Sequence, residues 1–225
     1  MKKAVLLFAV CLLATSMAFA QSSGNFDGAV FSGTCTIGAG GAFGGNGACQ
    51  NGTNASDCEV LNTTIKTSSG SGVTLLITPS AVTGLFTDTK ITTTIPSASA
   101  EIGIKVCVNV DGSAAHVVGG DINGCAMYDE RFQQISTNLF STITECATAT
   151  TECNFDLILS TLSAHSYNFL AQVPNGQHTV TAAWSVVDAA ATANSGSSVA
   201  ACLGPGNVTV TQTKVFSNSG STLTF

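Results

Sequence analysis

The residues with the clearest chemistry in this chain are its cysteines. Nine occur, and Cys11 lies in a leading apolar segment that is expected to be removed. The remaining even number predicts up to four disulfide bonds in an exported protein, although eight cysteines allow 105 pairings. No two are spaced Cys-x-x-Cys, so the usual signature of zinc ribbons, haem attachment and thioredoxin-like redox sites is missing. We therefore predict structural disulfide bonds at Cys35, Cys49, Cys58, Cys107, Cys125, Cys146, Cys153 and Cys202.

Two pairings are suggested by local sequence. Apolar residues alternate along 102–110, and Cys107 falls on the opposite face of that strand from the core. Its disulfide bond must therefore attach a segment that lies over the outer face of the strand, and Cys125 is the nearest candidate partner. Cys146 and Cys153 flank a short Ala/Thr-rich segment, which favours a local bond between them.

The three histidines are candidate metal ligands. On the strand pairing described below, His165 and His178 both face the core. They lie about eight residues apart along the strand direction, and at about 3.3 Å per residue this is roughly 26 Å. They cannot bind one ion, and His116, in a loop, could approach only one of them. We therefore expect histidines at strand ends whose ring nitrogens are satisfied by backbone groups, and no metal cofactor.

The acidic residues leave a calcium site open as an alternative. Residues 121–124 (Asp-Ile-Asn-Gly) and Glu130 fit part of a calcium-binding loop, and Asp111 could complete a different oxygen cage. The first ligand position falls on Gly119, however, and the flanking helices are missing. Asp129 and Glu130 are adjacent and should point to opposite faces of a strand, which is poor geometry for an acid–base pair.

Motifs of nucleophilic catalysis are absent from the sequence. There is no Gly-x-Ser-x-Gly elbow and no His-Glu-x-x-His. A hydrolase whose catalytic triad assembles only in the fold stays open as an alternative. The scarcity of ionisable groups favours a protein that is not an enzyme.

The first twenty residues have the layout of a secretory signal peptide. Lys2 and Lys3 precede an apolar run over 4–14, and the small residues Ala18 and Ala20, at −3 and −1, predict cleavage near Ala20. The run is too short to span a bilayer, and no later stretch is long and apolar enough for a membrane helix. We expect a secreted bacterial protein, extracellular or periplasmic.

The charge of the mature chain argues against polyanionic partners. Five basic residues stand against thirteen acidic ones after position 20, a net charge near −8. Nucleic acid and anionic membranes are therefore poor partners. Only 9% of all residues are charged, so Ser, Thr, Asn and Gln supply the surface polarity.

Short strands with period-two patterns dominate the chain after residue 58. Examples are 73–78, 102–110 and 155–159, punctuated by Gly, Pro and Asn. This predicts an all-β protein, an antiparallel β-sandwich of jelly-roll type, with an immunoglobulin-like sandwich as the alternative. We divide the chain into a signal peptide (1–20), a Gly/Cys-rich N-terminal extension (21–58) and a β-sandwich domain (59–225).

A hairpin is predicted around Pro174-Asn175-Gly176-Gln177. The strands 166–173 and 178–187 would pair symmetrically across this turn. Phe169 would then face Ala182, and Tyr167 would face Trp184 at one end of the core.

Three stretches carry a resemblance to a known group of proteins. They are Ser163-Ala164-His165-Ser166-Tyr167-Asn168-Phe169, Asn175-Gly176-Gln177-His178-Thr179-Val180 and Gly204-Pro205-Gly206-Asn207-Val208-Thr209-Val210. Together they resemble uncharacterised secreted bacterial β-sandwich proteins with a jelly-roll domain of the tumour-necrosis-factor type. The resemblance covers roughly the last sixty residues and implies a fold but no activity.

The sequence thus favours a non-catalytic extracellular module that binds a protein or glycan, or builds a surface assembly as an oligomer. A carbohydrate-binding module is the second hypothesis and would need an exposed aromatic platform. Tyr128, Tyr167 and Trp184 are the large polar aromatics available, and the predicted hairpin turns the last two inward.

Overall fold

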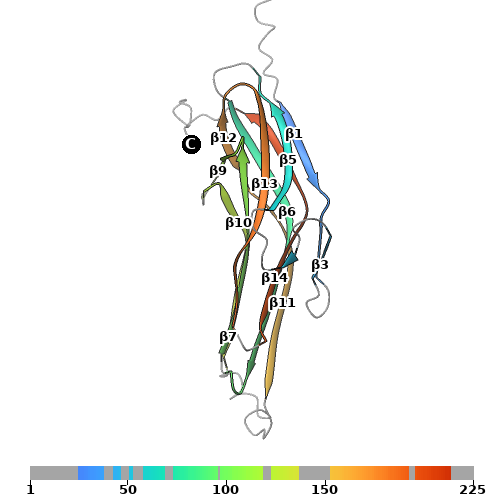
Figure 1. The fold of residues 1–225 in the computed structure, drawn as a ribbon, viewed down its shortest axis with the longest axis vertical. Coiled ribbons are helices and arrows are strands. Elements are labelled where there is room, and N and C mark those ends of the chain that lie inside the picture. Colours follow the sequence, from blue (N-terminus) through green and yellow to red (C-terminus); the bar gives the residue numbers. More distant parts are fainter. Residues whose placement is uncertain are drawn as a thin grey trace, which may run out of the picture.

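A computed structural model describes residues 25–37, 43–46, 51–52, 58–68, 73–95, 97–118, 123–136, 153–192 and 196–213. These residues form strands joined by turns, with no helix among them, and all strands but two belong to two antiparallel sheets packed face to face. The predicted all-β antiparallel sandwich is therefore confirmed, while its jelly-roll connectivity stays a prediction. Figure 1 shows an elongated sandwich whose longest strands run along the long axis of the molecule.

The larger sheet, sheet A, is built around the 20-residue strand β6, which bonds to β14 on one side and to β11 and β12 on the other. Because β6 is so long, β11 and β12 pair with it one after the other. The strands of sheet A are β1 (Phe26–Phe31), β4 (Asn51–Gly52), β6 (Val73–Thr92), β9 (His116–Val117), β11 (Asn154–Ser166), β12 (Phe169–Val173) and β14 (Ser198–Thr213).

The second sheet, sheet C, has the order β10-β7-β13-β5, with the two-residue β8 pairing with β7. Its strands are β5 (Cys58–Lys66), β7 (Ser97–Val110), β8 (Ser113–Ala114), β10 (Cys125–Ser136) and β13 (Gln177–Ala191). A separate ribbon of β2 (Thr34–Ile37) and β3 (Phe43–Asn46) makes the third, two-stranded sheet, sheet B.

The core lies between sheets A and C and follows the predicted period of two. Ile102, Ile104 and Val108 of β7 are fully buried, whereas the alternate residues Lys105 and Asn109 are partly exposed. Most of the remaining core comes from β6, β12, β13 and β14. Alternation therefore placed the core side of β7 correctly.

The predicted hairpin is wrong. The segment before the turn, β12, pairs with β6 and β9 in sheet A, whereas β13 pairs with β5 and β7 in sheet C. Residues 174–177 therefore carry the chain from one sheet to the other. Turn residues specify a reversal of direction but not whether the two strands share a sheet. Here each strand bonds to other partners, and Phe169 and Trp184 face the same core from opposite sheets.

Two disulfide bonds lie wholly within the described residues. Cys107 bonds to Cys125, its direct neighbour across the β7–β10 pair, which confirms the predicted pairing. Cys35 bonds to Cys202 and fixes β2 to β14. Cys58 and Cys153 are also disulfide-bonded. Cys49 and Cys146 fall outside the described residues, and so does the predicted Cys146–Cys153 bond.

The segment predicted as an N-terminal extension contributes to the sandwich. Its strand β1 pairs with β14 along six residues at the edge of sheet A, and Cys58 opens β5. Figure 1 shows β1 on the outer side of the upper half, beside β5. The predicted signal peptide, residues 1–20, lies outside the described residues.

Candidate functional site

A serine, a histidine and an aspartate meet where the edge of β10 approaches β11. Tyr128 is the extra residue of a β-bulge in β10, and the next residue, Asp129, turns its carboxylate between the sheets. Asp129 Oδ2 accepts hydrogen bonds from Ser163 Oγ and Thr83 Oγ1, both at 3.0 Å. The Nε2 atom of His165 lies 2.9 Å from Ser163 Oγ and 3.7 Å from Asp129 Oδ2.

This arrangement has the composition of a catalytic triad but not its geometry. In a triad the histidine accepts the serine proton at one ring nitrogen and donates to the aspartate from the other. Here the Ser163 hydroxyl donates a hydrogen bond to Asp129, and both residues lie near the same nitrogen of His165. Since Ser163 Oγ then accepts from His165, the histidine is not positioned as its general base. The three side chains link the two sheets.

The link continues along β10 through the next inward-facing residues. Arg131 donates from Nη1 to the carbonyl oxygens of Leu85 (3.2 Å) and Leu159 (3.0 Å), and from Nη2 to Thr161 Oγ1. Gln133 donates to the Leu157 carbonyl at 2.9 Å and accepts from Thr87 Oγ1 at 2.7 Å.

Two of these acceptors, the carbonyls of Leu157 and Leu159, belong to the edge strand β11, and a third, the Leu85 carbonyl, belongs to β6. Burial lowers the pKa of the Arg131 guanidinium, and nearby Asp129 opposes that shift. We call Asp129, Arg131 and Gln133, with their partners on β6 and β11, the β10–β11 seam.

The three large polar aromatics do not form a platform. Trp184 is fully buried, as predicted, and its indole N–H has no hydrogen-bond partner among the described residues. Tyr128 is buried too, donates to the Pro79 carbonyl at 2.6 Å, and has its pKa raised by burial. Tyr167 was predicted inward but is 36% exposed, because the chain crosses between sheets at the turn instead of forming the hairpin. Its ring packs at 5.1 Å from that of Tyr128, the two planes inclined at 43°.

His178 holds the crossing between the sheets. It is 3% exposed, and its two ring nitrogens face oxygen acceptors: Asp111 Oδ2 at 2.7 Å and the Pro174 carbonyl at 2.9 Å. An imidazolium satisfies both acceptors, whereas a neutral ring can donate to only one. Asp111 also accepts from the backbone N–H of Thr179 at 2.8 Å. The expectation of a histidine satisfied by backbone groups is met at one nitrogen, and a carboxylate occupies the other.

We expect Asp111→Asn to lower the free energy of unfolding, and to lower it most at neutral pH. The hydrogen bond from His178 is the main cause that lowers the Asp111 pKa below its ordinary value of 3.8. A lowered folded-state pKa gives stability that is present above the unfolded value and lost as pH falls through the folded value. Urea denaturation at pH 3 and pH 6 should therefore show a smaller pH effect in the variant. Asn tolerates the positive φ of 51° at this turn, so the change isolates the charge.

The control for this prediction is a double-mutant cycle with His178→Leu. In the His178→Leu background, Asp111→Asn should lower the free energy of unfolding clearly less, because the main hydrogen-bond partner of Asp111 is already gone. Equal costs in both backgrounds would show that the two side chains are not coupled.

The described residues contain no group of three side chains fit to hold a metal ion. Asp111 is hydrogen-bonded to His178. Asn123 precedes the bulge at the start of β10 and Glu130 follows it. Asp121 and Gly119, which the calcium hypothesis also uses, fall outside the described residues. The histidines lie on three different strands, β9, β11 and β13.

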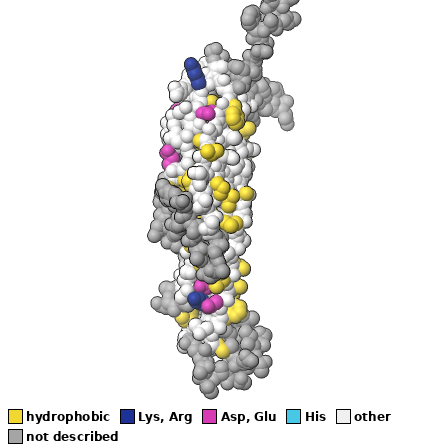
Figure 2. Space-filling view, turned by 90° about the vertical axis from the view of Figure 1, so that its right-hand side faces the viewer, with side chains coloured by type: hydrophobic (Ala, Val, Ile, Leu, Met, Phe, Trp, Pro, Cys, Tyr) yellow, Lys and Arg dark blue, Asp and Glu magenta, His cyan; other side chains and the backbone are white. Residues whose placement is uncertain are grey.

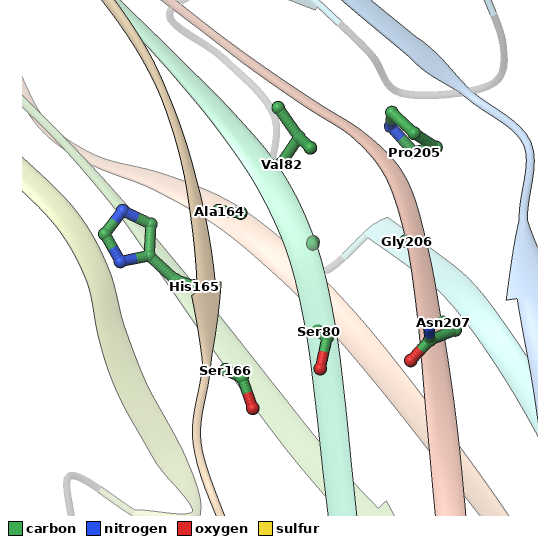
Figure 3. Close-up of a pocket in the computed structure, with 9 residues that line it drawn as sticks. Ser80, Val82, Ala164, His165, Ser166, Pro205, Gly206 and Asn207 are labelled. Carbon is green, nitrogen blue, oxygen red and sulfur yellow. The ribbon is translucent and has the colours of Figure 1, made fainter.

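A shallow groove of about 370 Å³ lies across β11, β6 and β14. Ser166, Ser80 and Asn207 are direct neighbours in the sheet register and form one polar row across the three strands. Figure 3 shows these three side chains side by side, with Val82 and Pro205 beyond them and the His165 ring turned away from the row. In the described part of the chain the three polar side chains make no hydrogen bond to protein, so their donors and acceptors face solvent.

Backbone shape creates this groove. The register between β14 and β6 shifts between Leu203 and Gly206, and Gly204 has a φ of +127° with its backbone close to that of Gly33. A side chain on Gly206 would come within 2.7 Å of the Ser80 carbonyl. The β14 bulge and the lack of a side chain at Gly206, which lines the groove, therefore shape this part of its wall.

Sequence reasoning did not single out the groove. Its lining residues come from three distant segments, and Ser and Asn are so common in this chain that they give no signal. The register of β6 with its two neighbours had to be known first.

Comparison with known proteins gives no further guide. No protein-family profile matches this chain, and no curated protein is significantly similar to it. In the part of the chain that the structure describes, no helix is long and apolar enough to cross a membrane.

Proposed function

We propose that this chain is a secreted, non-catalytic binding or surface-assembly module. The observation that carries the proposal is the row of Ser166, Ser80 and Asn207, whose hydrogen-bonding groups are open to solvent in a groove. Its disulfide bonds suit an oxidising compartment outside the cytoplasm. The Ser163–His165–Asp129 group speaks against a hydrolase, since its hydrogen bonds run in the wrong direction.

The groove favours a neutral, hydroxyl-bearing ligand, which makes a carbohydrate-binding module the second candidate. The polar row carries no charge, and the neighbouring Val82, Ala164 and Pro205 supply apolar surface for the C–H face of a sugar ring. None of the described residues that line the groove is a Phe, Tyr or Trp, so the aromatic stacking surface of many sugar sites is not present there. A neutral patch on an extracellular protein is the other ligand that this groove suits.

We expect Asn207→Ala to weaken binding at the groove about tenfold, the loss of roughly one good hydrogen bond. The mature protein is titrated with neutral tetrasaccharides of glucose, xylose, mannose and N-acetylglucosamine by calorimetry, and then with candidate extracellular proteins. Gln134→Ala, at an exposed position on β10, is the control and should bind like the wild type. Binding that Asn207→Ala leaves unchanged would place the ligand elsewhere, and a wild type that binds no probe would overturn the groove as the ligand site.

The likeness to jelly rolls of the tumour-necrosis-factor type remains part of this proposal. Many jelly rolls serve as binding or assembly modules and not as enzymes. Support comes from the two-sheet antiparallel architecture and from the crossing of the chain between sheets at residues 174–177.

A further inference from the structure

Strand β1 presents an edge unlike the others in this sandwich. Phe26 and Val30 are 68% and 84% exposed, and with Gly28 they occupy one face of the strand. The Asn25 carbonyl accepts from the Gln212 N–H of β14 at 2.8 Å, so the alternate residues Phe26, Gly28 and Val30 direct their backbone groups to the open side. In the described part of the chain, no strand pairs with that side.

Side chains bond to two backbone groups on each of the open edges of β5 and β11, whereas on β1 the Asp27 carboxylate bonds to the Gly28 N–H. At β5, Asn25 Nδ2 donates to the Lys66 carbonyl at 2.6 Å, and Asp27 accepts from Thr63 Oγ1 at 2.7 Å and from the Thr64 N–H. At β11 the β10–β11 seam does the same.

The fourth long edge, β10, is interrupted by the bulge at Tyr128 and carries the charged, exposed Glu130. Bulges and charges are devices that keep edge strands from pairing. Strand β1 has no bulge, no proline and no charge on its outer face.

We propose that β1 is the interface through which two copies of this chain associate, edge to edge and antiparallel about a two-fold axis. This deepens the proposed function by naming a second copy as the assembly partner. A two-fold axis at Gly28 sets Phe26 of one copy opposite Val30 of the other, twice, with the two Gly28 residues at the centre. Such apolar cross-strand pairs stabilise antiparallel sheets, and two-fold pairing makes one strand complementary to itself.

The charges near β1 allow this pairing. Asp27 is the acidic residue of the strand, and its carboxylate turns inward to Thr63 and Thr64 of β5 and does not face the partner. The Asp27 carboxylate also accepts a hydrogen bond from the Gly28 N–H. In the dimer, this N–H would instead donate to the Gly28 carbonyl of the second copy. A groove of about 590 Å³, lined by Asn25, Phe26 and Asp27 from the β1 side and by residues 64–66 of β5, leaves room beside the edge.

The size of the contact predicts a weak association. A six-residue strand and two large side chains per copy fall below the roughly 1,200 Å² of surface that stable complexes bury. Figure 2, which views the side where β1 lies in Figure 1, shows exposed apolar side chains and few charged ones. We therefore expect a dimer with a dissociation constant between about 10 μM and 1 mM.

Sedimentation velocity of the mature protein across that concentration range tests the proposal. Val30→Lys should abolish dimers, because a lysine at an edge opposes pairing and its 84% exposed position costs the monomer little. Phe132→Lys, at a 61% exposed apolar position on β10, is the matched control and should dimerise like the wild type. Loss of association in both variants would indicate general hydrophobic attraction and overturn the proposal.

A cysteine experiment tests the register. A mixture of Phe26→Cys and Val30→Cys proteins, each oxidised after folding, should form a covalent heterodimer, whereas either variant alone should not cross-link. Cross-linking of the single variants would overturn the register about Gly28. A wild type that stays monomeric throughout would overturn self-association and leave binding at the groove intact, since that binding is measured separately with Asn207→Ala.

Discussion

Replacing Cys35 and Cys202 together by alanine is expected to lower the free energy of unfolding by about 2–5 kcal/mol. The bond joins residues 167 positions apart, so its loss frees a long loop of the unfolded chain. It also fixes β2 over sheet A, where its sulfur atoms lie above Gly84: a Cβ at that glycine would come within 2.5 and 2.7 Å of them. Urea denaturation of the protein under non-reducing conditions measures the change.

The matched control is the double replacement of Cys107 and Cys125. That bond spans 18 residues and joins neighbours in adjacent strands that the β7–β10 ladder already holds together. We expect a smaller loss, because the shorter loop has less entropy to regain. If removal of the short bond costs as much as removal of the long one, loop length does not govern the contribution of these bonds.

The sequence predicted those features of the fold that depend on side-chain alternation within one strand. The buried face of β7 and the outward position of Cys107 both follow from a period of two, and Cys125 then proved to be its neighbour. The turn at 174–177 was recognised, but its strands were assigned to one sheet. The choice between a hairpin and a crossing depends on which other strands compete for the same hydrogen bonds, and local sequence does not contain that information.

The same limit applies to the candidate sites. Asp129 and Glu130 do point to opposite faces, as adjacent residues in a strand should. That Asp129 would meet Ser163 and Thr83 depended on a bulge at Tyr128 and on the β6–β11 register. The groove needed the β14 bulge as well. Neutral residues carry little sequence signal, so a site made of serine and asparagine becomes visible only when the strands are in place.

We expect Arg131→Met to lower the free energy of unfolding by about 2–4 kcal/mol. The substitution keeps an unbranched side chain but removes all donors to the Leu85 and Leu159 carbonyls and to Thr161. Leu85 is fully buried, so water cannot readily replace the lost donor at its carbonyl. Asp129 also loses its nearby positive charge. Chemical denaturation measures the loss, and amide hydrogen exchange should show the greatest increase along β11.

Glu130→Gln is the control for this prediction, because it changes the charge of the adjacent, exposed residue and leaves the β10–β11 seam intact. Its effect should stay within about 0.5 kcal/mol, as for most surface substitutions. Faster exchange confined to β11 in Arg131→Met would show that the seam secures this edge strand to the opposite sheet. Equal stability of the two variants, or exchange that rises evenly over both sheets, would contradict that role. In that case the hydrogen bonds within the β6–β11 ladder alone would hold the edge.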